Sequence, residues 1–298
     1  MACHTAVSPR FAGEGQPRLE VADVFRRFGQ AYRQRHRLTY AQRKVMWYIE
    51  NCRTPALGAS AYTCADCGHE QPQFNSCGNR HCPKCPAPAQ AEWIAKRQQR
   101  VLPVRHFHVV ITLPAQLRPV AAANRKLVFD LLFRSSADML LDLGANPKRL
   151  GAQLGITAVL HTWTRELQFH PHLHCIVTAG GLTRGDSARW IHTTPDFLFH
   201  VNVMSQLFRG KFLDGLKKLH QQQELVVPAA GGGLATGAQF QSLLDELYDL
   251  DWNVYCKEPL GGPEHIFRYL GRYTHRVAIS NQRLLSIDDE AICFLTKD

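Results

Sequence analysis

Apolar residues recur three or four positions apart in the first fifty residues, and this period is then lost. Between residues 21 and 28, Val and Phe side chains have the spacing of one helix face, so we expect helices within residues 19–51. Residues 52–88 hold six cysteines together with Gly, Pro and Asn, and show little periodicity. This pattern predicts a small, loop-rich module that needs cross-links or metal for stability.

The remaining two thirds of the chain alternate between strand-like and helix-like patterns. The predicted strands are residues 106–113, 155–162, 172–178 and 252–257. The predicted helices are residues 89–102, 117–143, 201–223, 239–250 and 263–275. Nine residues join the second and third strands, which favours an antiparallel pair, and short strands with turns are expected over 276–296. This order is typical of an α+β fold.

Composition and charge narrow the class of protein. The chain has 298 residues, of which 45% are hydrophobic and 20% charged, as in folded globular proteins. No run of eighteen apolar residues occurs and the start lacks the apolar core of a secretion signal, so we expect a cytoplasmic protein without a membrane segment. Residues 1–105 carry 16 Lys or Arg against 7 Asp or Glu, within a net charge of +10. A basic first third favours a nucleic-acid partner, although a solvated basic surface would give the same count.

The cysteine pattern predicts a metal site. Cys64 and Cys67 are separated by two residues, as are Cys82 and Cys85, and fourteen residues lie between the pairs. Two such turns can bring four thiolates around one zinc ion, and a closed shell of four ligands is typical of a structural site. Four further residues could complete a second site, replace a ligand or simply pack in the module: Cys52, His69, Cys77 and His81. Arg80 and Lys84 flank the module and suit phosphate contacts.

A histidine cluster predicts a second metal centre. Residues 170–174 read His-Pro-His-Leu-His, and on a strand His170, His172 and His174 share one side while the intervening apolar residues face the other. Two imidazoles on one strand face suit a divalent metal. A third ligand could come from His161, if its strand pairs with this one, or from His170, and Glu166 in the connection is less suitable. Three ligands leave open positions, as in catalytic sites, whereas isolated buried histidines would simply be hydrogen-bonded.

A tyrosine pair supplies candidate nucleophiles. Tyr269 and Tyr273 are four residues apart and therefore share one face of the predicted helix. Arg268, Arg272 and Arg276 lie beside them and suit DNA phosphates. A tyrosine hydroxyl can attack a phosphodiester when cationic groups stabilise the developing charge. Two aromatic residues at this spacing are otherwise typical of a helix packed in a core, and the nucleophile interpretation depends on the histidine cluster.

Three blocks of this sequence resemble the rolling-circle transposases of the insertion-sequence ninety-one type. The His172-Leu173-His174 element resembles the HUH (His-hydrophobic-His) motif, and the tyrosine pair resembles that of the two-tyrosine subclass. The cysteine block CGHEQPQFNSCGNRHCPKC, the block HTWTRELQFHPHLHCIVTAGGL and the block RYLGRYTHRVAISN occur in the order of the family. The resemblance covers the chain from about residue 25 to its end.

The resemblance implies the domain organisation and the chemistry. Residues 1–18 are rich in Gly, Pro and polar groups, which predicts a flexible tail. With the resemblance, we expect a helical and zinc-binding DNA-docking domain over 19–102 and an HUH catalytic domain with an RRM-like antiparallel sheet over 103–298. The resemblance implies nicking of single-stranded DNA at transposon ends, a 5′-phosphotyrosine intermediate and strand transfer, with Mg²⁺ or Mn²⁺ bound by His161, His172 and His174. The host replication machinery is a candidate partner, and the protein is expected at the bacterial nucleoid when bound to DNA.

Other functions fit parts of the pattern. A plasmid relaxase or replication initiator would use the same chemistry, but the cysteine module before the HUH block favours the transposase. Family members continue beyond the point where this chain ends, so an inactive, truncated copy that acts only as a zinc-dependent DNA-binding protein is a further alternative. A histidine-metal hydrolase of small molecules would leave the basic first third and the tyrosine pair unexplained.

Overall fold

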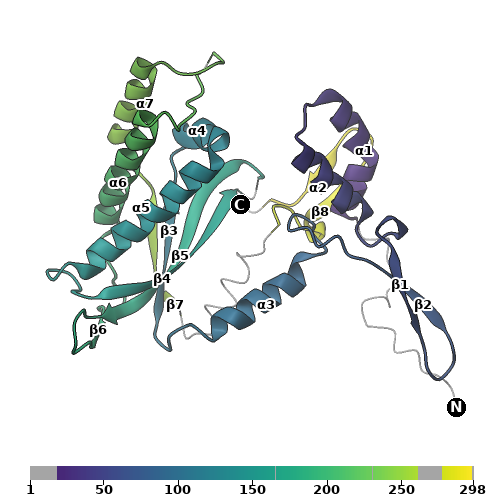
Figure 1. The fold of residues 1–298 in the computed structure, drawn as a ribbon, viewed down its shortest axis with the longest axis horizontal. Coiled ribbons are helices and arrows are strands. Elements are labelled where there is room, and N and C mark those ends of the chain that lie inside the picture. The colour runs from purple at the N-terminus through teal and green to yellow at the C-terminus, as the bar shows by residue number, and fades with distance from the viewer. Residues whose placement is uncertain (1–18, 165, 230, 261–276, 297–298) are drawn as a thin grey trace. The chain divides into compact units, whose positions relative to one another are not determined.

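The computed structural model describes residues 19–164, 166–229, 231–260 and 277–296. The chain divides into two compact units, each with its own hydrophobic core. The first unit contains the N-terminal residues and the described C-terminal strands, and the second contains most of the chain between them (Figure 1). α3 (Pro86–Gln98) runs across the point of division.

The first unit is a helical pair followed by a hairpin. Its elements are α1 (Val21–Arg35), α2 (Tyr40–Asn51), the 3₁₀ turn η1 (Pro55–Leu57), β1 (Ala59–Thr63), β2 (Glu70–Phe74), the 3₁₀ turn η3 (Asn281–Arg283), β8 (Leu284–Ile287) and β9 (Ile292–Phe294). Both helices begin with a capping box, formed by Glu20 and Asp23 for α1 and by Thr39 and Gln42 for α2. Such boxes satisfy amide groups that the first helical turn leaves without partners.

The described C-terminal strands share the core of this first unit. Leu284 is buried together with Val21, Ala22 and Ile49, and the side chain of Asn281 accepts a hydrogen bond of 3.0 Å from the backbone N–H of Val21. Sequence reasoning grouped these strands with residues 103–298 because they follow them in the chain. The contact is formed over a separation of 260 residues, which no local pattern reports.

The second unit is an antiparallel sheet with helices against one face (Figure 1). Its elements are β3 (His106–Thr112), the 3₁₀ turn η2 (Ala115–Leu117), α4 (Arg118–Ala123), α5 (Arg125–Ala145), β4 (Gln153–Trp163), β5 (Phe169–Leu182), β6 (Trp190–His192), α6 (Val201–Gln221), α7 (Gly237–Asp249) and β7 (Val254–Leu260). The strand order is β4-β5-β3-β7, with β6 paired to β5. A βαββαβ chain with this order has the ferredoxin-like topology that RRM domains share, which confirms the expected antiparallel sheet.

The predicted helix over 117–143 is divided at Asn124. This residue has φ −126° and ψ 47°, so it separates α4 from α5. Its buried amide donates to the carbonyls of Val120 and Val226 and accepts from the N–H of Val226. These bonds attach the loop after α6 to the break between α4 and α5. The apolar periodicity of the sequence continues unchanged across this break, so the pattern predicted a single helix.

Strand alternation sorts the sheet into two faces. Leu173, Cys175 and Val177 of β5 are buried in the core with Val109 and Ile111 of β3. Their neighbours along each strand point to the opposite face, because successive side chains alternate. The histidines of β3, β4 and β5 therefore lie on the face away from the helices.

Two candidate metal centres

Three histidines come together on the face of the sheet opposite the hydrophobic core. His161 of β4 lies directly opposite His172 of β5 in the antiparallel register, and His174 is two residues further along β5. One ring nitrogen from each of the three lies within 4.8 Å of the others. The structure thus brings together the three residues that were predicted as ligands of a divalent metal.

Hydrogen bonds fix the orientation of two of these rings. His172 Nδ1 lies 2.7 Å from the carbonyl oxygen of His170, so this nitrogen carries the hydrogen and Nε2 carries the lone pair. His174 Nδ1 lies 2.9 Å from Nε2 of His108, a residue of β3 that is only 2% exposed. Histidine ligands of metals characteristically donate their second ring N–H in this way.

Burial favours the neutral form of two imidazoles at this site, those of His172 and His108. Burial lowers the pKa of His172, although the hydrogen bond to the His170 carbonyl opposes this shift. Burial, with a smaller contribution from Lys257, lowers the pKa of His108 from 6.5 to about 4. A neutral imidazole offers the lone pair that a metal requires, so the electrostatics of the face suit cation binding.

His170 and Glu166, the two competing ligands, lie outside this group. Nδ1 of His170 is 3.2 Å from a guanidinium nitrogen of Arg118, and burial, the neighbouring His172 and Arg118 lower its pKa. Among the described residues, the group of ligand atoms contains neither side chain. Sequence reasoning did not single out His108. The signal was present in the alternating His-Phe-His at the start of β3, which places His106 and His108 on one strand face.

The predicted nucleophiles lie outside the described residues. Tyr269 and Tyr273 fall in the segment 261–276, together with Arg268, Arg272 and Arg276. Their roles therefore stay predictions from the sequence.

The cysteine cluster differs from the predicted zinc set. Cys82 and Cys85 meet Cys52 and Cys77, and the four sulfur atoms lie within 4.8 Å of one another. Among the described residues, this group contains Cys52 and Cys77 in place of Cys64 and Cys67, which the sequence predicts. Cys64 and Cys67 lie in the turn that joins β1 to β2, next to the Thr63–Glu70 pair, while Cys52 and Cys77 flank the other end of the hairpin.

The spacing of the sulfur atoms suits tetrahedral coordination. Cys85 Sγ lies 3.4 Å from Cys52 Sγ and 3.6 Å from Cys77 Sγ. Four thiolates at about 2.3 Å from a central zinc ion are separated by about 3.8 Å. Burial, assisted by the bonds to Cys85 and Cys52, raises the pKa of the Cys77 thiol to about 11. Burial alone would raise the pKa of Cys85, but hydrogen bonds from the other three thiols lower it. The cluster thus favours the thiolate form of Cys85, and a bound cation would replace the protons of the thiols.

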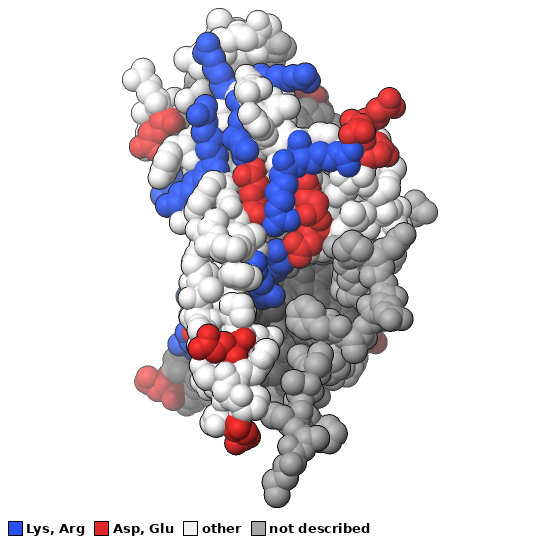
Figure 2. Space-filling model, turned by 90° about the vertical axis from the view of Figure 1, so that its right-hand side faces the viewer, with Lys and Arg blue, Asp and Glu red and all other residues white. Residues whose placement is uncertain are grey.

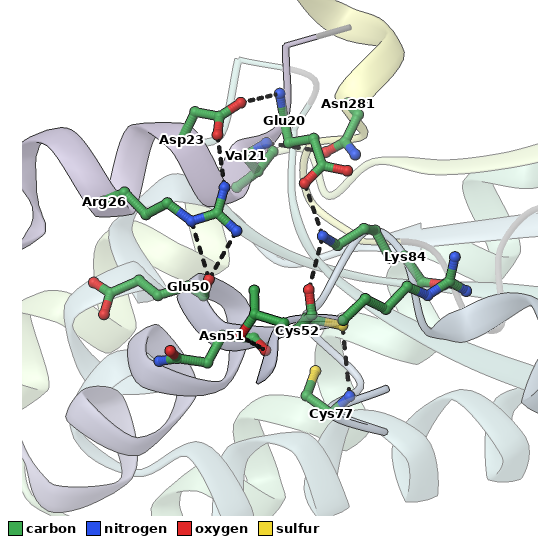
Figure 3. Close-up of polar contacts among 12 residues, drawn as sticks. Glu20, Val21, Asp23, Arg26, Glu50, Asn51, Cys52, Cys77, Lys84 and Asn281 are labelled. Atoms are coloured by element: carbon green, nitrogen blue, oxygen red, sulfur yellow. Dashed lines mark hydrogen bonds and ion pairs between the residues drawn. The ribbon is translucent and has the colours of Figure 1, made fainter. Parts of the chain in front are cut away.

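Lys84 stabilises the module around this cluster. Its ammonium group donates to Glu20 at 2.7 Å and to the carbonyl of Cys52 at 3.0 Å, and the side chain is only 15% exposed (Figure 3). Both partners are internal to the unit, and the predicted contact of Lys84 with DNA phosphates stays a prediction. Arg80 is exposed, and its predicted role in DNA binding stays a prediction.

Comparisons with known proteins agree with these features. Residues 24–113 match the family described as "Transposase zinc-binding domain", and residues 155–298 match the family described as "Putative transposase". Within the part of the chain that the structure describes, no helix is both long enough and apolar enough to cross a membrane.

Two named relatives and one solved structure are similar to the chain. "Putative transposase y4qJ" of Sinorhizobium fredii is 46% identical over 280 residues, which cover 94% of this chain and 70% of that protein. The transposase for insertion sequence element IS801 of Pseudomonas savastanoi pv. phaseolicola is 32% identical over 235 residues, covering 78% and 55%. The conjugative relaxase TrwC in complex with oriT DNA, in a metal-bound structure, covers 57% of this chain and 71% of its own at 12% identity. Its TM-score of 0.32 is too low to bear on the fold. The identity and coverage of the first relative, together with the zinc-binding domain, show that this chain belongs to the transposases of the insertion-sequence ninety-one (IS91) type.

Proposed function

We propose that this transposase nicks single-stranded DNA at transposon ends through a tyrosine nucleophile at the histidine site. The observation that carries the proposal is the convergence of His161, His172 and His174 on one face of the sheet, in a chain of the transposase family. A small-molecule hydrolase would not need the basic first third of the chain or the tyrosine pair.

The three histidines fit a divalent metal by their donor chemistry. The ring nitrogens lie within 4.8 Å of one another, and two of the rings have their Nδ1 atoms in hydrogen bonds. Mg²⁺ or Mn²⁺ bound there would act as a Lewis acid on the scissile phosphate. Since imidazole is an unusual ligand for Mg²⁺, we expect Mn²⁺ to bind more tightly in solution.

The covalent step belongs to the tyrosines. The hydroxyl oxygen of Tyr269 or Tyr273 forms a bond to phosphorus, and the bond from phosphorus to the 3′ oxygen breaks. The tyrosine loses one proton and the departing 3′ oxygen gains one, so the products are a 5′-phosphotyrosine and a free 3′ hydroxyl. The second tyrosine allows another cleavage while the first remains attached to DNA. Arg268, Arg272 and Arg276 would stabilise the charge on the phosphate.

The cysteine cluster would hold a structural zinc ion. Cys52, Cys77, Cys82 and Cys85 supply four thiolates, which leave no position for a substrate. Their segments are the end of α2, the end of the hairpin and the turn before α3, so one ion would join three parts of the unit.

A covalent adduct assay tests the proposed function. The full chain is incubated with Mn²⁺ and labelled single-stranded DNA from the flank of its own gene, and the products are separated under denaturing conditions. We expect a DNA-linked protein band that is lost in the Tyr269→Phe/Tyr273→Phe double variant and strongly reduced in His172→Ala. An adduct that persists in the double variant would refute the nucleophile assignment. Zinc content measured on each variant controls for the integrity of the first unit.

Adduct formation with a plasmid origin, but not with the flank of the gene, would indicate a relaxase or replication initiator. DNA binding without any adduct, at full metal occupancy, would indicate a DNA-binding protein without strand-transfer activity.

A further inference from the structure

The exposed side of α2 combines aromatic rings with cations. Tyr40 is 80% exposed and Trp47 is 45% exposed, although Met46 and Ile49 of the same helix are buried. Lys44 Nζ lies 6.0 Å from the ring centre of Tyr40 and 5.8 Å from that of Tyr48. Large aromatic side chains on a helix surface are costly in water, and here they occur on one side.

The exposed aromatic residues and Lys44 line a hollow of about 650 Å³ between α1 and α2. Its lining residues are Arg33, Tyr40, Arg43, Lys44, Trp47, Tyr48 and Glu50. We refer to it as the α2 groove.

The α2 groove has an excess of positive charge. The Glu50 carboxylate pairs with Arg33 at 2.7 Å, and its backbone carbonyl accepts from Arg26. Arg43 and Lys44 are exposed and add two cations to the lining. On the side of the molecule drawn in Figure 2, Lys and Arg side chains gather in the upper part, with Asp and Glu side chains beside them. The partner that fits is therefore anionic.

We propose that the α2 groove binds single-stranded DNA, with unpaired bases stacked on Tyr40 and Trp47 and phosphates near Arg43 and Lys44. Aromatic rings interleaved with cations are the usual platform for single strands. In a duplex the base faces are covered by their neighbours, so an exposed ring adds little there, whereas an unpaired base can stack on it. The inference rests on the proposed function for the kind of DNA involved, and it adds a binding surface that is separate from the histidine site.

Binding of a labelled oligo(dT) to the full chain tests the groove. Fluorescence anisotropy is measured in buffer without added Mg²⁺ or Mn²⁺, so that no cleavage occurs and the zinc is retained. We expect Tyr40→Ala and Trp47→Ala each to weaken binding by about 5- to 150-fold, the range for loss of one stacked base. Tyr40→Phe and Trp47→Phe keep an aromatic ring and should bind nearly as tightly as the wild type.

Two control variants separate the groove from general effects. Tyr62→Ala removes a ring of the same unit that is 62% exposed on β1 and should leave binding unchanged. Arg43→Ala should lower the slope of log affinity against log salt by about 0.7, the value for one phosphate contact to a single strand. Lys126→Ala, at an exposed site on α5, should leave that slope unchanged.

The inference is overturned if the Tyr40→Ala/Trp47→Ala variant melts normally and still binds oligo(dT) like the wild type. Equal losses for oligo(dT) and a duplex of the same length, or an equal loss in the Phe variants, would also overturn it. These outcomes are independent of the adduct assay. If the protein forms the adduct but the groove variants bind oligo(dT) normally, the proposed function stands and the groove inference fails. If the groove variants lose binding but the wild type forms no adduct, only the groove inference stands.

Discussion

His108 should control metal affinity without binding the metal. Its Nε2 atom lies 2.9 Å from Nδ1 of His174, the two rings are parallel to within 6°, and their centres are 5.1 Å apart. If His174 binds the cation through Nε2, its Nδ1–H donates to His108 and the ring is held in one orientation. We class His108 as a positioning residue, since it acts through His174.

The magnitude follows from this one hydrogen bond. Loss of an outer partner of a metal-bound histidine typically reduces metal affinity 10- to 100-fold, or about 1.4 to 2.7 kcal/mol. His108→Phe is the sharpest perturbation, because it fills most of the buried volume but has no acceptor. His108→Gln provides an amide oxygen as a substitute acceptor, so it should recover part of the affinity. The bond from His172 goes to a backbone carbonyl and is unchanged in both variants.

Calorimetric titration with Mn²⁺ measures this effect, and the electron paramagnetic resonance spectrum of the bound ion reports its ligand geometry. We expect weaker binding and an altered spectrum for His108→Phe. The reasoning fails if His108→Phe folds normally and binds Mn²⁺ with wild-type affinity, because the hydrogen bond would then have no role in holding His174. It also fails if the Gln and Phe variants lose the same affinity, since the acceptor would then be irrelevant.

Three further predictions address the metal cluster, acid stability and the helix break. Cys77→Ser should release the zinc ion of the cluster and lower the melting temperature of the protein, because the energy of zinc binding contributes to folding. Zinc content measured by atomic absorption should fall in this variant. If Cys77→Ser retained zinc and Cys64→Ser lost it, the proposed cluster would be contradicted. In the metal-free protein, His108 of the unfolded state binds a proton below about pH 6.5, whereas His108 of the folded state does so only below about pH 4. The free energy of unfolding should therefore fall by up to about 3 kcal/mol as the pH drops from about 6.5 to about 4. Urea denaturation at pH 7 and pH 5 should show a smaller difference in His108→Gln, and an equal difference would exclude His108 as the titrating group. Asn124→Ala should destabilise the second unit by about 1 to 3 kcal/mol in urea denaturation, because it removes two hydrogen bonds to the part-buried backbone of Val226. A change under about 0.5 kcal/mol, less than one ordinary hydrogen bond, would show that water replaces them.

The histidine site could be predicted from the sequence because it depends on local rules. Alternation along a strand places His172 and His174 on one face, and a short connection between two strands predicts an antiparallel pair. The register then brings His161 opposite His172. His108 lies on a strand that is adjacent in the sheet but 66 residues away in the chain, so the local pattern places it on a strand face but does not report its contact with His174.

The cysteine set could not be predicted because equal spacings do not determine which pairs meet. Cys64–Cys67 and Cys82–Cys85 have the same spacing, and the prediction joined them. A hairpin between Cys52 and Cys77 carries the first pair to its far end, and brings together two cysteines that belong to no short motif. The strands of that hairpin are exposed along their whole length, so their sequence lacks the apolar alternation that would have indicated them.

The arrangement of the first unit links its metal cluster to the α2 groove. Cys52 is the residue that ends α2, and its carbonyl accepts from Lys84, which in turn pairs with Glu20 at the start of α1. A zinc ion at Cys52 would therefore fix the end of the helix that carries Tyr40, Lys44 and Trp47, and the Lys84 contacts would hold α1 beside it. The cluster offers no open coordination position for a substrate, whereas three histidines do. The cysteines are thus suited to positioning a DNA-binding surface, and the histidines to chemistry on the DNA.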